Sequence, residues 1–295
     1  MNQFSISQLA QFSGIKPHTI RMWEQRYNAL IPNRSKGNTR YYDNSQLRRL
    51  LNIVSLIEAD FKVSEVSAMK DKALFKLVEE TQTTTTKRLS GYFVSQLIAA
   101  GMSYDEPQFD KIFSHCLLRY GMKDAYVEVI YPAIARIGVM WCSNALPPAN
   151  EHFISNLFRQ KLFTAIDSLP NAKPGAESWL LFSPENEFHE IGLLLSRYLI
   201  RLAGNKVIYL GNNLPLESVF DAVQQTKSSK ILLFLVHNDW LYDIQIYINK
   251  LHTALSDKKI YVAGNERIIG KLTSGKKMKL LKSVQDLEEE LKINV

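Results

Sequence analysis

The segment from Ser5 to Asp43, SISQLAQFSGIKPHTIRMWEQRYNALIPNRSKGNTRYYD, decides the fold of the N-terminal part of the chain. Ser5 or Ser7 can cap a first short helix, whose apolar residues recur at helical spacing. Gly14 is suited to end that helix, and Pro17 is suited to the first turn of a second one. Two short helices joined through a glycine turn predict a helix-turn-helix motif.

The residues after the second helix predict a β-hairpin wing. Proline and glycine break helical structure between residues 32 and 37, and the pair Tyr41 and Tyr42 follows Arg40. The wing therefore carries basic and aromatic groups. Apolar residues then recur at spacings of three and four over residues 47–57, which predicts a helix whose apolar face belongs to the core.

Positive charge is concentrated in the same part of the chain. Residues 1–50 hold eight Lys or Arg residues against Glu24 and Asp43, and the whole chain has a formal net charge of +7. A basic face near one end indicates either a polyanionic partner or a solvated surface.

Composition excludes several other classes of protein. The 295 residues are 46% hydrophobic and 22% charged, which fits two or three folded domains. The two cysteines, Cys116 and Cys142, give neither a disulfide framework nor paired zinc ligands. The N-terminus does not read as a signal peptide, and no apolar run reaches the roughly 18 residues of a membrane span. We therefore expect a cytoplasmic protein that does not cross a membrane.

The segment Ser5 to Asp43 resembles the winged-helix DNA-binding domain of MerR-type transcription regulators, through SISQLAQFSG, the recognition helix TIRMWEQRY and the wing NTRYYD. The resemblance implies that basic side chains contact phosphates and that the start of the recognition helix reads base edges of double-stranded operator DNA. Tyr42 is expected to pack the wing, and Trp23 reads as a core residue. The expected DNA-binding set is His18, Thr19, Arg21, Arg26, Arg34, Lys36, Asn38, Arg40 and Tyr42.

The rest of the sequence divides into a linker and two domains. The polar stretch EETQTTTTKRLSG is interpreted as part of a linker over residues 76–91, after a DNA-binding domain in residues 1–75. Residues 92–172 carry four amphipathic segments, which predict a four-helix bundle. Residues 177–295 alternate five apolar runs with helical segments, which predicts a flavodoxin-like α/β domain with a five-stranded parallel sheet. The expected fold class is therefore multi-domain, with an all-α winged helix-turn-helix first.

The turn PENEFHEIG, residues 184–192, follows the first predicted strand of the α/β domain, and a helix is expected from Phe188 to Ala203. Ligands of open parallel sheets bind in the crevice at the carboxyl ends of the strands. His189 lies in that crevice, where a neutral imidazole can bind a metal while a carboxylate holds its other ring nitrogen. A histidine that only caps the helix is the alternative from the residues alone.

The pattern Glu187-x-His189-x-x-Gly192 resembles the histidine turn of cobalamin-binding domains. The resemblance implies that His189 is the lower axial ligand of cobalt, that Glu187 holds its imidazole, and that Gly192 lets backbone approach the macrocycle. Gly211 and Gly264 are expected in the same crevice.

The order of the three domains resembles light-responsive adenosylcobalamin-dependent repressors of carotenoid genes. In that family a tryptophan and a Glu-His pair cover the upper face of the cofactor, which implies that role for Trp141, Glu151 and His152. Cys142 stands where the photoreceptors have a histidine that ligates cobalt after illumination.

Two further differences from the pattern of cobalamin-binding domains fall where the cofactor's nucleotide tail would lie. The third strand ends LLFLVHND without the usual serine, so Leu235 or Val236 can crowd the tail, and Ala263–Gly264 replaces a double glycine. The expected function is a DNA-binding regulator, a repressor and not an enzyme, whose oligomeric state (dimer or tetramer) or DNA affinity responds to cobalamin and to light. The alternatives are a regulator that has lost cobalamin and senses another ligand or a protein, and a corrinoid methyl carrier.

Overall fold

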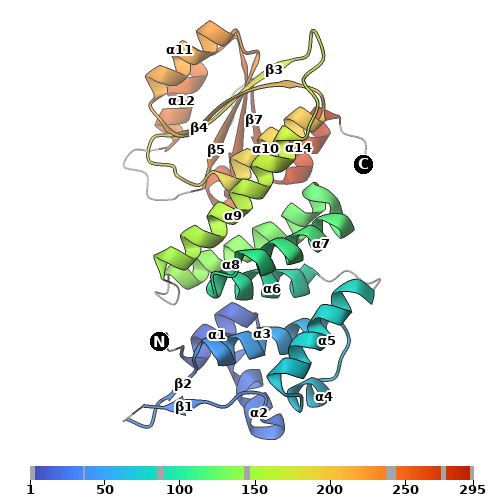
Figure 1. Ribbon diagram of the computed structural model, residues 1–295. Coiled ribbons are helices and arrows are strands. Elements are labelled where there is room, and N and C mark those ends of the chain that lie inside the picture. The colour runs from blue at the N-terminus through green and yellow to red at the C-terminus, as the bar shows by residue number, and fades with distance from the viewer. Residues whose placement is uncertain are drawn as a thin grey trace. The chain divides into compact units, whose positions relative to one another are not determined.

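The structure, a computed structural model, describes residues 4–35, 37–84, 90–142, 147–236, 244–273 and 277–292 (Figure 1). Its contacts divide the chain into two compact units, Met1–Leu157 and Phe158–Val295. The sequence-based division into three domains and a linker does not follow this partition. None of the helices in the described ranges combines the length and hydrophobicity that a membrane crossing needs.

The first unit begins with a helix-turn-helix and a wing. Helix α1 (Ile6–Ser13) starts at a capping box, in which the Ser5 hydroxyl accepts from Gln8 N and the Gln8 side chain accepts from Ser5 N. Helix α2 (Pro17–Tyr27) follows the Gly14 turn. Strands β1 (Asn33–Arg34) and β2 (Arg40–Tyr41) pair antiparallel as the wing.

Helix α3 (Asn44–Glu58) connects this head to the helices that follow it. Its apolar residues are buried on every side, which is typical of a helix packed between neighbours. One neighbour is α6 (Ser90–Met102), from which the buried Gln96 Nε2 donates to Asn52 Oδ1 at 2.9 Å and to Ser55 Oγ at 3.0 Å. Arg136 Nη1 of α8 (Tyr131–Cys142) donates to Phe12 O at 3.3 Å. The head and these helices therefore form one packed body, which explains why they share a unit.

The predicted linker is largely helical in the part that the structure describes. After α4 (Val63–Ser67), helix α5 runs from Asp71 to Thr84, and α6 begins at Ser90. Residues 85–89 of the predicted linker lie outside the described residues. The threonine run therefore starts inside a helix, because α5 packs against α3 and supplies what the local propensity of threonine does not.

The predicted helical bundle is present as α6, α7 (Glu106–Ala125), the π-helical turn η1 (Tyr126–Ile130) with α8, and α9 (Pro148–Asp167). Gly121 interrupts α7 with non-helical angles (φ 67°, ψ 174°), a backbone conformation that glycine adopts readily. The division between the two compact units falls within α9, after Leu157.

The second unit is a parallel sheet with strand order β4-β3-β5-β6-β7, as expected for the flavodoxin-like class (Figure 1). Helices α11 and α12 cover one face of the sheet and share a core with it. Helix α10 packs against β3 and β4 and contacts α14, which packs against β7. The strands are β3 (Ser178–Pro184), β4 (Lys206–Leu214), β5 (Lys230–Leu235), β6 (Lys259–Gly264) and β7 (Met278–Leu281), and the helices are α10 (Ile191–Leu202), α11 (Leu216–Thr226), α12 (Ile244–Ala254), α13 (Glu266–Ile269) and α14 (Val284–Leu291).

The turn after β3 is longer than predicted. Helix α10 begins at Ile191 instead of Phe188, because the Glu187 carboxylate accepts a hydrogen bond from His189 N at 3.0 Å and holds that segment outside the helix. The strand order also places β3 between β4 and β5, so this turn stands at the switch point of the sheet, where ligands of such folds bind.

Candidate functional site

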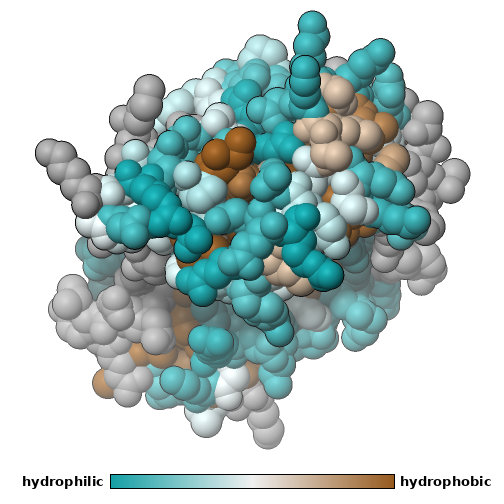
Figure 2. Space-filling view, turned by 90° about the horizontal axis from the view of Figure 1, so that it is seen from below, coloured by the Kyte–Doolittle hydropathy of each residue, from teal (hydrophilic) through white to brown (hydrophobic). Residues whose placement is uncertain are grey.

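The outer face of α2 presents the polar residues of the predicted DNA-binding set. His18, Arg21 and Arg26 are exposed and Thr19 is half-buried, whereas Ile20 and Trp23 are buried on the opposite face. Trp23 is thus a core residue. The face that Figure 2 shows is mostly hydrophilic, with smaller hydrophobic areas.

The wing adds further exposed groups. Arg34 Nη1 donates to Asn38 Oδ1 at 2.5 Å across the hairpin, and both residues are exposed. Arg40 is exposed as well, and its Nε lies 3.2 Å from Glu24 Oε1 of α2. Lys36 lies outside the described residues.

Tyr42 cannot contact DNA from its position, which corrects its place in the predicted DNA-binding set. Its side chain is completely buried, and its hydroxyl donates to Glu24 Oε2 at 2.6 Å. Burial and this hydrogen bond raise its pKa. Its backbone also pairs with Phe4, so Tyr42 joins the wing to α2 and to the N-terminal segment. The part of the prediction that had Tyr42 pack the wing agrees with this position.

The basic residues of the head have different roles. The Arg49 side chain is only 12% exposed and pairs with Asp71. It also donates to the backbone carbonyls of Ala29 at 2.7 Å, Met69 at 3.0 Å and Ser67 at 2.7 Å. Arg49 therefore ties α3 to the loops around it, so counting basic residues overestimates the charge available for a polyanion.

The second candidate site is the turn after β3. Glu187 is fully buried, and its Oε1 lies 2.7 Å from Nδ1 of His189, whose side chain is 58% exposed. A carboxylate at Nδ1 favours the tautomer that carries its proton there, which leaves the lone pair of a neutral imidazole on Nε2. The pair is therefore arranged as a metal-binding histidine with its orienting carboxylate.

Hydrogen bonds from residues of both neighbouring strands hold this turn in place. Val236 N, directly after β5, donates to Glu187 Oε2 at 2.7 Å. On the other side, Asn213 N of β4 donates to Glu187 O at 3.1 Å, and Asn212 Nδ2 donates to Phe188 O at 3.0 Å. Of these residues the sequence pointed only to Val236, as a side chain that can crowd the nucleotide tail, and it did not predict the hydrogen bonds that hold the turn.

Glu190 forms a second polar group beside the turn. It accepts from the Tyr209 hydroxyl at 2.6 Å and lies 3.3 Å from Arg159 Nη1 of α9. The guanidinium of Arg197 lies 4.9 Å from the centre of the Tyr209 ring. Burial, followed by the bond to Glu190, raises the pKa of Tyr209, so this hydroxyl stays protonated. Gly211 lies next to Glu190 and Tyr209 at a register shift of the sheet.

Packing of the chain itself accounts for the other two predicted glycines. A Cβ on Gly192 would overlap the Phe234 ring, and one on Gly264 (φ 135°) would overlap the backbone of Leu235. The absence of a Cβ at Gly192 makes room for the Phe234 ring, and a role of this glycine in the approach of a macrocycle stays a prediction.

The residues predicted for the upper face of the cofactor lie in the first unit. Glu151 and His152 start α9, with 3.6 Å between Glu151 Oε2 and His152 Nδ1, and the His152 side chain is 72% exposed. Trp141 and Cys142 end α8, and their side chains lie outside what the structure describes. Glu187 and His189 belong to the second unit.

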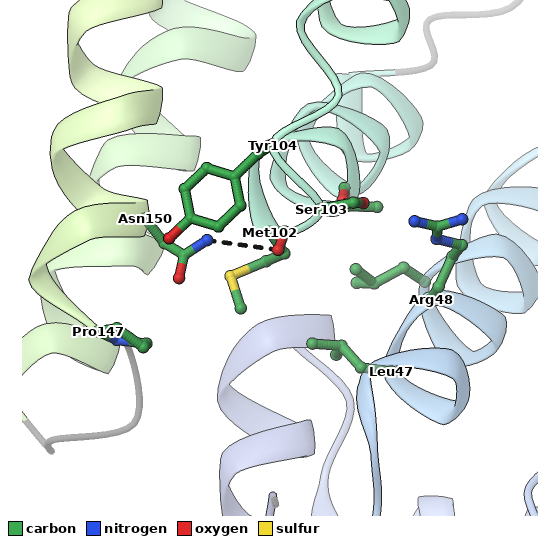
Figure 3. Close-up of a pocket in the computed structure, with 9 residues that line it drawn as sticks. Leu47, Arg48, Met102, Ser103, Tyr104, Pro147 and Asn150 are labelled. Atoms are coloured by element: carbon green, nitrogen blue, oxygen red, sulfur yellow. Dashed lines mark hydrogen bonds between the residues drawn. The ribbon is translucent and has the colours of Figure 1, made fainter. Parts of the chain in front are cut away.

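A cavity of about 560 Å³ opens beside the start of α9, between α3 and the end of α6. Asn150 lies at its wall, and its Nδ2 donates to Gly101 O and Met102 O at 3.3 Å (Figure 3). Arg48 and Tyr104 also line it, with apolar groups of Leu47 and Met102. None of the predicted cofactor residues whose side chains the structure describes lines this cavity.

The donor set around His189 suits a metal that brings most of its own ligands. Among the described residues no three His, Cys, Asp or Glu side chains converge on one point. A single imidazole oriented by a buried carboxylate fits a cobalt ion whose remaining equatorial positions are filled by a macrocycle. The Glu187–His189 pair therefore fits a corrinoid, whereas the space behind Gly192 is filled by Phe234.

These two sites define a class of protein in which a DNA-binding head is joined to a corrinoid-type fold. Residues 4–72 match the MerR HTH family regulatory protein model, and residues 94–165 match the B12 binding domain model. The chain therefore carries the DNA-binding domain of MerR-type transcription regulators and a B12 binding domain.

The chain is homologous to two bacterial repressors. It is 26% identical over 260 residues to the HTH-type transcriptional repressor CarH of Myxococcus xanthus, covering 85% of each chain. It is 27% identical over 234 residues to the repressor CarA of the same organism, covering 78% of this chain and 76% of that one. A monomethylamine corrinoid protein from Methanosarcina barkeri has the same fold, with a TM-score of 0.53 and 14% identity over 67% of this chain and 96% of that one.

Proposed function

We propose that this transcription regulator binds double-stranded operator DNA under the control of a corrinoid whose cobalt is ligated by His189. The observation that carries the proposal is the fully buried Glu187, which binds His189 Nδ1 and Val236 N at once. Burying a carboxylate is costly unless it is hydrogen-bonded, and here it sets the tautomer and the direction of one exposed imidazole.

His18, Thr19, Arg21, Arg26, Arg34, Asn38 and Arg40 are the proposed contacts to DNA, since the described side chains of this group lie on α2 or on the wing and are at least partly exposed. Lys36 stays a proposed contact from the sequence alone. The basic members supply affinity and salt dependence, and the start of α2 supplies base recognition.

Control by the ligand requires that it bind one state of the protein better than another. Helix α9 belongs to both units, and its residue Arg159 is ion-paired with Glu190, next to the His189 turn. Trp141, Cys142, Glu151 and His152, which lie in the last turn of α8 or the first turn of α9, remain proposed contacts of the same ligand. We propose that ligand binding fixes an assembly, a dimer or a tetramer, in which several heads bind one operator with increased effective concentration.

We infer the form of the ligand and the sign of regulation from the resemblance to other regulators. The repressors CarH and CarA support a repressor rather than an enzyme, and the resemblance to light-responsive repressors favours adenosylcobalamin. When bound, the cobalt supplies a light-sensitive bond to carbon. Cys142 would meet the cobalt after illumination in place of a histidine, so a thiolate would be the new ligand.

The direct test is a visible spectrum. The purified protein is incubated with adenosylcobalamin in the dark, desalted, and compared with His189→Ala. We expect a retained corrinoid spectrum in the wild type that is lost or shifted in the variant, and illumination should alter it differently in Cys142→Ser. Identical spectra for wild type and His189→Ala would contradict ligation by His189.

A further inference from the structure

The space between the sheet and α10 behind the His189 turn is filled by a side chain of the protein. Phe234 of β5 is half-buried, and its ring lies against the backbone of Gly192 in the first turn of α10. The contact is so close that even a methyl group on Gly192 would overlap the ring. The glycine and the phenylalanine are therefore a matched pair that closes this space.

The two residues after Phe234 have fixed partners too. Leu235 is fully buried in the core that the sheet shares with α11 and α12. Val236 N donates to the buried Glu187 carboxylate at 2.7 Å. The end of β5 thus cannot shift away from Gly192 without exposing Leu235 or leaving the Glu187 carboxylate short of a donor, so the backbone that carries Phe234 is held in place.

Corrinoids differ in what hangs below the ring. Cobalamin carries a nucleotide with a benzimidazole base that binds its own cobalt, whereas cobinamide ends before the nucleotide. If an imidazole of the protein takes the lower position, it displaces this base, and the nucleotide must then find room on the side of the ring where His189 stands. The Phe234 ring occupies space next to the His189 turn, against the backbone of Gly192.

We propose that Phe234 is a specificity-determining residue that disfavours the nucleotide, so that the chain binds cobalamin but binds a corrinoid lacking the nucleotide, such as a cobinamide, more tightly. This inference rests on the proposed ligation of a corrinoid by His189. The contacts between His189, Glu187 and the cobalt do not depend on Phe234, so the choice concerns the nucleotide alone.

The test compares two corrinoids and one matched pair of variants. Hydroxocobalamin and diaquacobinamide are titrated into wild type, Phe234→Ala and Phe234→Leu, and binding is followed by visible absorption. Cobinamide has no internal base to displace, so the informative quantity is how the ratio of the two affinities changes between wild type and variant. We expect Phe234→Ala to strengthen cobalamin binding about ten-fold or more while cobinamide binding changes less than about three-fold.

Two controls separate an effect on corrinoid choice from an effect on folding. Phe234→Leu keeps an apolar group in the contact and so disturbs the domain less than Phe234→Ala does. Its ratio of cobalamin affinity to cobinamide affinity should lie between those of wild type and Phe234→Ala. Gly192→Ala should lower the melting temperature in wild type and lower it less in the Phe234→Ala background, because the overlapping ring is then gone.

The outcomes distinguish the role of Phe234 from the proposed ligation by His189. An unchanged ratio in both Phe234 variants, with both corrinoids bound at His189, would overturn the role of Phe234 and leave the proposed function standing. Binding of neither corrinoid by any of the proteins would overturn the proposed function and this inference with it. Loss of both spectra in His189→Ala confirms that the titrations report the intended site.

Discussion

At the scale of single residues, Glu187 determines what His189 can do. The His189 side chain is 58% exposed, and the hydrogen bond to the buried carboxylate restricts the orientation of its ring. The resemblance of this turn to the histidine turn of cobalamin-binding domains implied this pair. It did not predict the Val236 donor or the Phe234 ring, because both depend on how β5 lies beside β3, which the local pattern of either strand does not contain.

Replacing Glu187 by Gln tests this role directly. The amide keeps an acceptor for one N–H group but no longer stabilises the tautomer, so corrinoid affinity should fall about 10–100-fold. Retention of the corrinoid spectrum after desalting is the measurement. Glu185→Gln, an exposed change in the same turn, is the control and should bind as wild type does. Equal losses in both variants would mean that the effect is not specific to the carboxylate below His189.

At the scale of elements, the start of α3 illustrates how capping fixes a helix in the head. Asp43 accepts from the Ser45 hydroxyl and from Gln46 N, and these bonds hold its pKa below the usual range. The Asp43 carboxylate therefore stabilises the fold above the ordinary Asp pKa, and this contribution is lost as the pH falls toward the lowered value.

Asp43→Ala should lower the free energy of unfolding by about 1 kcal/mol at neutral pH. The difference from wild type should shrink as the pH falls below the ordinary Asp range of about 4 and toward the lowered pKa of the folded carboxyl. Chemical denaturation at both pH values measures this, with Asp43→Asn as the control that keeps an acceptor. A difference that does not depend on pH would remove the charge from the explanation.

Arg49 is the second test at this scale. Removing it leaves the carbonyls of Ala29, Ser67 and Met69 without this donor, so Arg49→Ala should cost about 2–4 kcal/mol of unfolding free energy. Arg48→Ala, the neighbouring exposed arginine, should stay within about 0.5 kcal/mol of wild type. Similar losses in both variants would contradict the structural role of Arg49.

Most helices and strands could be predicted from the sequence pattern, but not all of them. Helical periodicity predicted the helix-turn-helix, α3, the bundle helices and the helices that follow the strands, and the apolar runs predicted all five strands of the sheet, whereas α5 was not predicted. The threonine run was read as a linker because threonine is a poor helix former, yet α5 continues to Thr84. Contacts with distant residues decide such cases, and a single sequence shows neither these contacts nor that α3 is buried on all sides.

At the scale of the whole molecule, the proposed DNA contacts predict a dependence on salt. Arg21→Ala and Arg26→Ala should each reduce the slope of log affinity against log salt by about 1 on a duplex of mixed sequence. Lys173→Ala, an exposed lysine of the second unit, should leave the slope unchanged. Fluorescence anisotropy over a salt series provides the measurement, and an unchanged slope in both arginine variants would place the DNA elsewhere.

The central claim is that corrinoid binding at His189 changes the affinity of the head for DNA. A duplex selected from a random pool by the protein serves as the probe, and its affinity is measured in the dark with and without adenosylcobalamin, with diaquacobinamide in a parallel series. We predict that the corrinoid that binds changes the affinity of the wild type about ten-fold, within the usual range of coupling between two sites, and leaves His189→Ala at its ligand-free affinity. A wild type that binds the corrinoid but shows the same DNA affinity with and without it would contradict the account.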